Sequence, residues 1–457
     1  MPRVPEANHF TSGEDTHPLL PADAALLPLT SGQLLVSPAY AVFCRVPNED
    51  IRAVSACLQG ELASAQLPGH LVGELRRHGF GSPPREPAPA HRTVQLQLTN
   101  DCNLACSYCC TNSGRPRQRE VTREELLRVV KEVRAVMGPG ISVALLGGEP
   151  LLVPWALELG TAILDHELRL TLFTNGLLLA DEAIAAQVAA LIQRGAKVRV
   201  SLAAATREQC DALSGAERFD GALRGLATLA RFGARAGVDL MLAPHLVDEV
   251  AGSLQSLRAQ LPIGTEVALG VLYLSGRERG AHLFPSRAQL EAALDRVAFE
   301  AGELIEAPRP SPLAERREGC DCALGHHLHV RSDGVLFTCF KMEERVGHLA
   351  ELAFADALDQ LRTRARPART LPRCEGCALN TLCGGGCRSD NLMYTGDADT
   401  PICGEWRVRI VSELLAEDHV TALEWPVMHL LAEAHSRGIE APPRLDPLRS
   451  SRHLTET

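Results

Sequence analysis

The chain has 457 residues, a formal net charge of −10, 46% hydrophobic residues and 22% charged residues. This length exceeds one ordinary hydrophobic core and predicts two or three domains, while the composition excludes a wholly disordered protein. The negative charge argues against a general nucleic-acid binder, and no apolar run approaches the ~20 residues of a membrane span. Since the N-terminus also lacks a signal-peptide pattern, we expect a cytoplasmic protein without a nucleic-acid or membrane partner.

The N-terminal part reads as a small β/α module. Residues 1 to about 30 have no periodicity and suggest a loose arm. Alternation and helical spacing then predict two strands followed by two helices. These elements are expected at residues 32–38, 40–47, 48–62 and 67–81. The proline-rich stretch at 81–91 marks a linker, so residues 1–90 are predicted to form the arm and the module.

Six apolar strands then alternate with amphipathic helical stretches. The strands are predicted at residues 93–99, 141–146, 169–174, 197–203, 238–244 and 265–274. This alternation predicts an α/β fold whose parallel sheet is covered by helices, either a barrel or a doubly wound sheet. Both architectures bind ligands at the C-terminal ends of the strands. The stretches TNDCNLACSYCC, GGEP and TNG all follow such strand ends.

Twelve of the fifteen cysteines cluster between residues 102 and 110 or between 320 and 403. In a long chain without a signal peptide, such clusters indicate metal ligands rather than disulfides. Region 320–403 has little regular patterning, so we expect it to depend on metals for its stability. Cys44, Cys57 and Cys210 lie outside both clusters and are interpreted as buried or incidental thiols.

The first cluster is a C-x3-C-x2-C array formed by Cys102, Cys106 and Cys109. Zinc usually takes a closed tetrahedron of four ligands, whereas a [4Fe–4S] cluster takes one thiolate per iron. Three thiolates therefore leave one iron open to a substrate or cofactor. Cys110 directs its side chain differently from Cys109 and is expected to be a bystander.

These three cysteines, with Tyr108 before the third, resemble the signature of radical S-adenosylmethionine (SAM) enzymes. The resemblance implies that SAM binds the open iron and is cleaved reductively to a 5′-deoxyadenosyl radical, which abstracts hydrogen. It also implies a partial (β/α)6 TIM-like barrel, which we assign to residues 91–285. A lone GGEP or TNG is an ordinary turn, but both occur here in the family order. The SAM-contacting residues implied by the resemblance are Tyr108, Gly147, Gly148, Glu149, Pro150, Thr174, Asn175 and Ser201.

The chain departs from the family pattern after Ser201. Family members often continue with Asp-Gly, where this chain has Ala203 and Ala204, and Cys210 stands where histidine is common. Ser214 replaces an arginine that typically helps to bind the SAM carboxylate. Arg218 and Arg199 are the nearby candidates to replace it.

The second array resembles the SPASM domain, a cysteine-rich Fe–S domain with up to two auxiliary [4Fe–4S] clusters. Its C-x2-C-x5-C-x3-C part alone would also suit a zinc ribbon. The resemblance implies one cluster on Cys374, Cys377, Cys383 and Cys403, and another on Cys322, Cys339 and Cys387, with Cys320 as its possible fourth ligand. The clusters either transfer electrons or hold the domain together. We assign residues 286–410 to this domain and 411–457 to a C-terminal helix and tail.

The substrate is less clearly indicated, and no catalytic side chain is assigned. The N-terminal module resembles peptide-recognition elements of maturases of ribosomally made peptides, in which a leader peptide adds to a sheet edge. It could equally pack against the barrel. Five residues occupy strand ends where substrate contacts are expected, although an ordinary structural role is favoured for each. They are His245, Tyr273, Ser275, Arg277 and Arg279.

Three hypotheses follow. The leading one is a radical SAM/SPASM enzyme that modifies a precursor peptide and receives electrons from a flavodoxin- or ferredoxin-type donor. The second is the same chemistry on a sulfatase residue or a small-molecule cofactor precursor. The third is an inactive Fe–S scaffold, suggested by the missing Asp and Arg but opposed by the intact cysteines.

Overall fold

The computed structural model describes most of the N-terminal module, the predicted barrel and part of the cysteine-rich region. The described residues are 17–28, 32–40, 42–83, 93–241, 250–270, 276–277, 324–375, 377, 379–380 and 384–401. The predicted C-terminal helix and tail lie outside this range. So do Cys320, Cys322, Cys383, Cys403, His245, Tyr273, Ser275 and Arg279.

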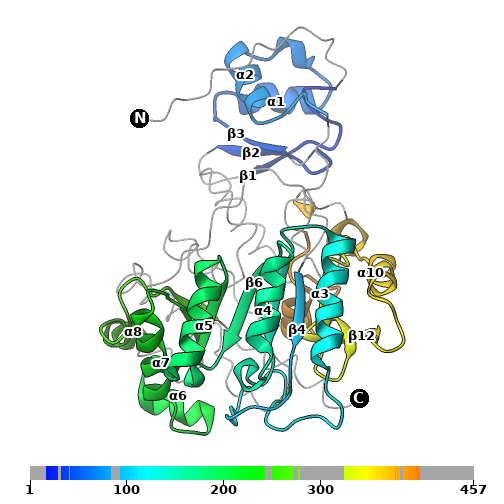
Figure 1. Cartoon of the computed structure of the whole chain (residues 1–457). Helices are drawn as coiled ribbons and strands as arrows, with labels where there is room; N and C mark the ends of the chain where they lie inside the picture. The colour runs from blue at the N-terminus through cyan, green and yellow to red at the C-terminus, as the bar shows by residue number, and fades with distance from the viewer. Residues whose placement is uncertain are drawn as a thin grey trace.

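The N-terminal module contains a three-stranded antiparallel sheet in the order β1-β2-β3 (Figure 1). The strands are Ala25–Pro28, Gln33–Ser37 and Val42–Val46, and the helices are α1 (Ile51–Leu58), η1 (Ser64–Gln66) and α2 (Gly69–Arg77). The predicted two strands and two helices are confirmed. The prediction of a loose arm was wrong for β1, because the backbone of β1 pairs with β2 and Leu26 packs on the module's apolar core.

The six predicted barrel strands are confirmed. They are β4 (Thr93–Gln97), β5 (Ser142–Leu146), β6 (Arg169–Thr174), β7 (Lys197–Ala203), β8 (Gly237–Met241) and β9 (Val267–Gly270). They pair in parallel in chain order, as expected for a partial TIM-like α/β barrel. Because parallel strands end at the same edge, the loops after β4, β5, β6 and β7 lie together.

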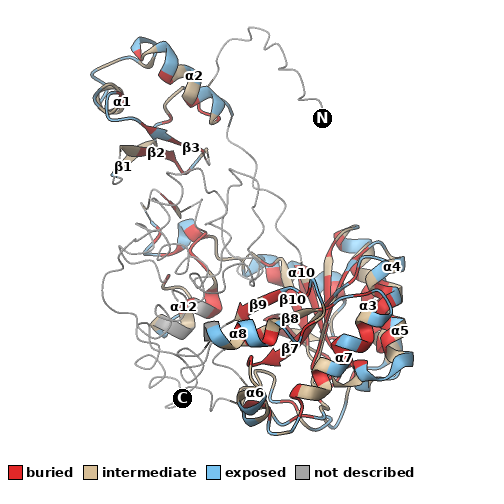
Figure 2. Ribbon diagram, turned by 90° about the vertical axis from the view of Figure 1, so that its left-hand side faces the viewer, coloured by how far each residue is buried: buried red, intermediate tan, exposed pale blue. Residues whose placement is uncertain are grey.

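Helices connect these strands and cover one face of the sheet (Figure 2). They are α3 (Arg123–Met137), α4 (Ala156–Asp165), α5 (Glu182–Gln193), α6 (Arg207–Ser214), α7 (Phe219–Arg231) and α8 (Val250–Arg258), with short turns η2 (Pro150–Leu152) and η3 (Leu177–Ala180). Alternate strand residues such as Leu96, Leu145 and Leu172 join the helices in one core. The opposite face carries polar residues such as Gln95 and Gln97.

A hairpin from the cysteine-rich region extends this sheet to nine strands. β10 (His327–Val330) pairs in parallel with β4, and β11 (Val335–Cys339) and β12 (Met342–His348) follow antiparallel. Helices α10 (Phe354–Thr363) and α12 (Arg388–Thr395) and the turn η6 (Ala368–Thr370) complete the described part. The expectation of little regular structure in region 320–403 was therefore wrong for these strands, because the backbone of β10 pairs with β4 along its whole length. The division at residue 286 stays a prediction.

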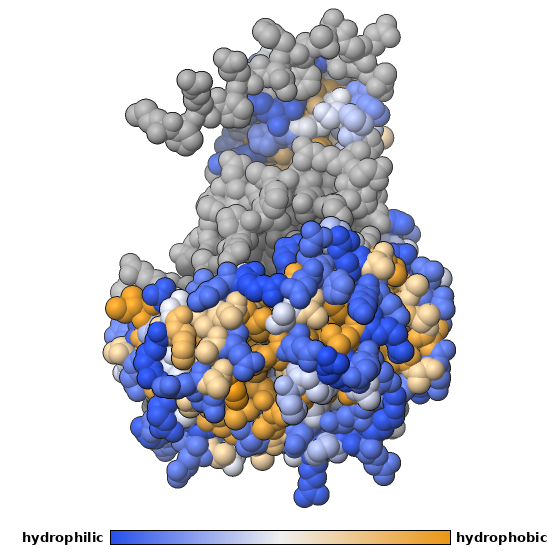
Figure 3. Space-filling view, in the orientation of Figure 1, coloured by the Kyte–Doolittle hydropathy of each residue, from blue (hydrophilic) through white to orange (hydrophobic). Residues whose placement is uncertain are grey.

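The surface of the large domain alternates between polar helix faces and apolar stripes, as Figure 3 shows on one side. No helix within the described residues is long and apolar enough to cross a membrane.

His329 on β10 provides a test of this sheet extension. It is 3% exposed, and burial lowers its pKa from 6.5 to about 3. The unfolded chain therefore takes up a proton below pH 6.5 while the folded chain does not, so stability is present above pH 6.5 and lost as pH falls. We expect His329→Phe to remove from urea unfolding a slope that rises from about 0.7 kcal/mol per pH unit at pH 6.5 to nearly ~1.4 at pH 5.

The control is His166→Phe at the end of α4, which removes an imidazole elsewhere in the fold. An unchanged slope in the His329 variant, or an equal loss in both variants, would contradict the burial of His329 against β4.

Candidate active site

The cysteine-bearing loop begins directly after β4 and is fixed by backbone contacts. Glu120 accepts hydrogen bonds from the Thr99 hydroxyl and the Asn100 backbone N–H, both at 2.6 Å. Further along, the Ala105 N–H donates to Ser214 O and the Ser107 N–H to Leu213 O. The loop is thus anchored to the α6 end of the barrel as well as to β4.

The three predicted cluster ligands share an electrostatic environment. Burial raises the pKa of the Cys102 thiol to about 11. A hydrogen bond from the Leu104 backbone lowers this pKa, whereas negative charge on Glu149, Cys106 and Cys109 raises it further. Burial also raises the pKa of Cys106, which Cys109 raises further. The three thiols are therefore close enough for their charges to interact, although they come from different turns of the loop.

The Cys109 sulfur is hydrogen-bonded within the loop. It accepts from the Ser113 N–H at 3.2 Å and lies 3.4 Å from the Thr111 hydroxyl. These contacts fix the position of the sulfur in the loop. The neighbouring Cys110 thiol has a pKa raised to about 12, chiefly by burial. Burial raises the pKa of Cys102 in the same way. The bystander role of Cys110 stays a prediction.

Glu149 connects three of the predicted strand-end motifs. The side chain is fully buried and accepts hydrogen bonds from Leu151 N, the Thr174 hydroxyl and Asn175 N at 2.7–3.0 Å. Burial raises the pKa of its carboxyl, while these hydrogen bonds act in the opposite direction. Asn175 also donates to Asn103 of the cysteine loop at 2.7 Å. The structure thus brings GGEP, TNG and the cysteine loop together.

Gly147 and Gly148 allow this convergence. A Cβ atom on Gly147 would lie 2.8 Å from Thr99 O, and one on Gly148 only 1.9 Å from Asp101 O. The Gly148 and Glu149 N–H groups donate to these two carbonyls. The close approach that the glycines permit is therefore to the cysteine loop itself. Pro150 is buried and begins the turn η2 that follows.

The departures after Ser201 have structural roles. Ala203 has φ +73, and the Ala204 N–H donates to Leu202 O across it, as in a γ-turn. The buried Cys210 thiol donates to the same carbonyl at 2.8 Å. Ser214 is fully buried, and its hydroxyl donates to Cys210 O. Cys210, predicted to be a buried or incidental thiol, is buried and helps to hold the turn that follows Ser201.

Arg218 is the candidate replacement for the missing arginine. It is 1% exposed, and its Nε and Nη2 groups have no hydrogen-bond partner in the part of the chain that the structure describes. Although burial alone would lower its pKa, Tyr108, Cys210 and Cys106 raise it. Arg199 is not equivalent, since its guanidinium pairs with Asp239 across β7 and β8.

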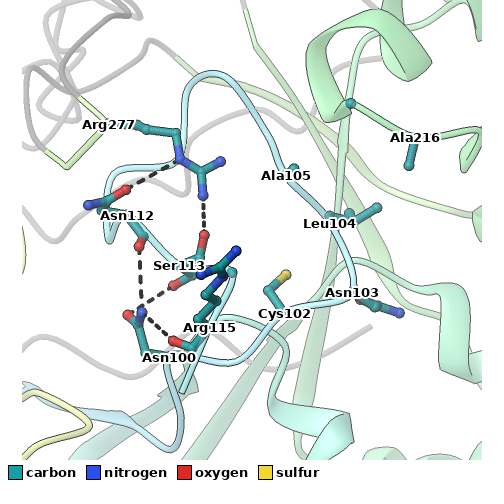
Figure 4. A pocket seen from close by; sticks show the side chains of 12 residues that line it. Asn100, Cys102, Asn103, Leu104, Ala105, Asn112, Ser113, Arg115, Ala216 and Arg277 are labelled. Atoms are coloured by element: carbon teal, nitrogen blue, oxygen red, sulfur yellow. Dashed lines mark hydrogen bonds between the residues drawn. The ribbon is translucent and has the colours of Figure 1, made fainter. Parts of the chain in front are cut away.

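A pocket of about 570 Å³ opens beside the cysteine loop (Figure 4). Its lining includes Cys102, Asn103, Arg115 and Arg277. The Cys102 sulfur points into the space between residues 104–105 and residues 112–115. This volume falls within the usual range of small-molecule sites.

The donor set suits a [4Fe–4S] cluster. The charges of Cys106 and Cys109 both act on Cys102, so the three thiols lie near one another. A cubane cluster takes one thiolate per iron, and three such thiols would hold three of its irons. The buried guanidinium of Arg218, with two unpartnered N–H groups near Cys106, matches an anionic group such as a carboxylate.

Four predicted auxiliary-cluster cysteines lie in the described part. Cys339 ends β11, the Cys377 N–H donates to Cys374 O, and Cys387 directly precedes α12. The glycine loop before Cys387 is held by Arg388 and Asn391, which both donate to Gly385 O. Their partners Cys320, Cys322, Cys383 and Cys403 lie outside the described residues, so both ligand sets stay predictions.

Sequence reasoning missed several residues that shape the site. Glu120 and Gly276 lie in no family motif, and Asn103 is one of the variable positions between Cys102 and Cys106. Their roles appear only through contacts that hold the cysteine loop. Arg277 was placed among possible substrate contacts but binds the loop itself. The signal in the sequence was only that residues 276 and 277 follow the sixth strand.

Known proteins resemble the chain over this region. Residues 96–255 match the profile of the radical SAM superfamily. The PqqA peptide cyclase of Xanthomonas oryzae pv. oryzae (strain MAFF 311018) is 27% identical over 332 residues, covering 69% of this chain and 88% of the relative. The mycofactocin maturase MftC of Mycobacterium ulcerans (strain Agy99) is 31% identical over 329 residues, covering 67% and 86%.

The fold is also shared with a solved structure. Native anSMEcpe with bound AdoMet gives a TM-score of 0.53 at 16% identity, covering 75% of this chain and 99% of that chain. The likeness extends the similarity in sequence to the arrangement of strands and helices.

The buried Glu149 carboxylate gives a testable prediction for the site. In Glu149→Gln, one acceptor oxygen becomes an amide that must face an N–H donor. We expect the free energy of unfolding to fall by ~1–3 kcal/mol in urea titrations. Glu158→Gln is the matched control, since its carboxylate pairs with Arg123 on the surface and should matter little. Equal effects of the two substitutions would show that Glu149 does not organise the site.

Proposed function

Because the chain belongs to the radical SAM superfamily, we propose that it is an enzyme that modifies a ribosomally made precursor peptide by hydrogen abstraction. The observation that carries this is the cysteine loop, whose three interacting thiols are fixed at the C-terminal edge of a partial barrel. Membership implies a [4Fe–4S] cluster and SAM as cofactors. When bound together, they supply a radical that abstracts hydrogen from the substrate.

Different residues of the chain bind the cluster, bind SAM and hold these segments in place. Cys102, Cys106 and Cys109 hold the cluster. The Gly147–Pro150 segment and Thr174, Asn175 and Ser201 line the strand ends where SAM binds, and Tyr108 packs beside Cys106. Glu149 acts by holding the GGEP and TNG segments against the cysteine loop.

Arg218 supplies the cation that the SAM carboxylate needs. Its burial, and the lack of a partner for Nε and Nη2 among the residues that the structure describes, support this role, because an ionic hydrogen bond is strongest where water is excluded. Ser214 cannot supply it, since its small, fully buried side chain is already bonded to Cys210.

The cysteine-rich region is proposed to carry the auxiliary clusters, with ligands as the SPASM resemblance implies. A flavodoxin- or ferredoxin-type protein in the cytoplasm would deliver the electrons, because the chemistry consumes reducing equivalents that the chain does not itself generate. The four-part division at residues 90, 285 and 410 belongs to this proposal.

A peptide substrate is supported by the relatives, which are a cyclase named for the PqqA peptide and a mycofactocin maturase. The N-terminal module offers a place for such a peptide. β3 is a terminal strand of the module's sheet and pairs with β2. An extended leader peptide can add there as a further strand.

The cluster assignment is tested by two neighbouring cysteines. We expect Cys109→Ala to lose about four irons per chain after anaerobic reconstitution and to form no 5′-deoxyadenosine with dithionite and SAM. Cys110→Ala, one residue away, should keep both the iron and the activity. The reverse pattern would show that the ligand register is wrong, and no cleavage by the unaltered chain would favour an inactive scaffold.

Peptide recognition is tested by hydrogen exchange on the full chain. A precursor peptide encoded beside the gene should slow exchange of the Val42–Val46 amides that face away from β2, because added strands protect edge amides. Ala25–Pro28, the opposite edge, is the internal control and should not change. Peptide binding with protection confined to the barrel would contradict the recognition role, and turnover of a small molecule without peptide binding would favour the second hypothesis.

A further inference from the structure

Gly276 and Arg277 lie against the cysteine loop although they are more than 160 residues away in sequence. Gly276 has φ +74, and a Cβ atom there would lie 2.3–2.4 Å from backbone atoms of Cys109 and Cys110. The Arg277 N–H donates to Cys109 O at 2.9 Å. The two backbones are therefore in direct contact, which only glycine permits at this position.

The Arg277 side chain spans the loop (Figure 4). Its Nη1 donates to Cys106 O at 2.6 Å, its Nη2 to Ser113 O, and its Nε to Asn112 Oδ1 at 3.3 Å. All three acceptors are uncharged, and Arg277 forms no ion pair with the residues that the structure describes. Arg231, in contrast, is an exposed arginine whose charge is paired with the carboxylate of Glu182.

We propose that Arg277 is a positioning residue that sets the shape of the cysteine loop and favours the reduced state of its cluster. The planar guanidinium fixes two carbonyls and an amide at once, which a lysine cannot do. The carbonyl of Cys106 belongs to a predicted ligand, so holding it orients that thiol. A cation this close also favours the added electron, because net charge around a cluster sets its potential. This inference rests on the proposed function.

The test uses the full chain with Arg277→Gln, which removes the charge, and Arg277→Lys, which keeps the charge but loses the fork. Arg231→Gln is the matched control, since it removes an exposed arginine from α7. Two measurements are made on each protein, one on the chain without iron and one after reconstitution.

The first measurement is the alkylation rate of individual thiols in the iron-free chain, read by mass spectrometry. Cys57 in the N-terminal module serves as the internal reference. Both Arg277 variants should alkylate Cys106 and Cys109 about tenfold faster relative to Cys57, because lost hydrogen bonds favour local opening. The Arg231 variant should match the unaltered chain.

The second measurement is the reduction of the cluster whose electron paramagnetic resonance signal changes on adding SAM. At a fixed potential, the reduced-to-oxidised ratio should fall about tenfold in Arg277→Gln, equivalent to 59 mV for one electron. Arg277→Lys should retain most of the ratio because it keeps the charge. A general structural defect would instead lower the reduced-to-oxidised ratio equally in both Arg277 variants.

Unchanged alkylation rates and an unchanged ratio in Arg277→Gln would overturn the inference, as would equal losses of the ratio in both variants. If the unaltered chain shows no SAM-sensitive cluster, the proposed function fails instead. The alkylation rates then still decide whether Arg277 holds the loop, because they require no cluster.

Discussion

The arrangement of the site depends on the buried carboxylate of Glu149. Its two oxygens accept hydrogen bonds from Leu151, Thr174 and Asn175, so the ends of β5 and β6 cannot move independently. Through Asn175 and Asn103 the same network reaches the cysteine loop. A buried polar network of this kind is specific only when its members are satisfied. The GGEP motif therefore links the ends of β5 and β6, and any contact of its backbone with a ligand depends on this link.

Electrostatics at the site are governed by burial and by two arginines. Arg218 lies near the Cys106 thiol, and Arg277 binds the Cys106 carbonyl. Desolvation raises the pKa of Cys102 and Cys106 and opposes their ionisation, whereas cluster binding requires thiolates. The charge of Arg218 lowers the pKa of Cys106 and offsets part of that cost. The replacement of the family arginine by Ser214 is thus accompanied by another buried cation close by.

Much of the fold followed from the sequence because its signals are local. All six barrel strands were recognised from short apolar runs, and GGEP and TNG were correctly placed at strand ends. β1 and β10 were missed because each is a four-residue segment that becomes a strand only by pairing with a neighbour. Cys210 was interpreted as a buried or incidental thiol and is buried, but nothing in the sequence shows that it donates to Leu202 O.

The cysteine loop itself shows why the site could be predicted only in part. The spacing of its cysteines is set by twelve consecutive residues, but its shape depends on contacts with distant parts of the chain. Gly148 supports it from β5, Ser214 from the end of α6, and Arg277 from beyond β9. None of these three contacts involves a thiol, and each joins segments far apart in the chain. Motifs therefore identify the chemistry of the loop, whereas the long-range contacts determine how its thiols are presented and how readily a bound cluster would accept an electron.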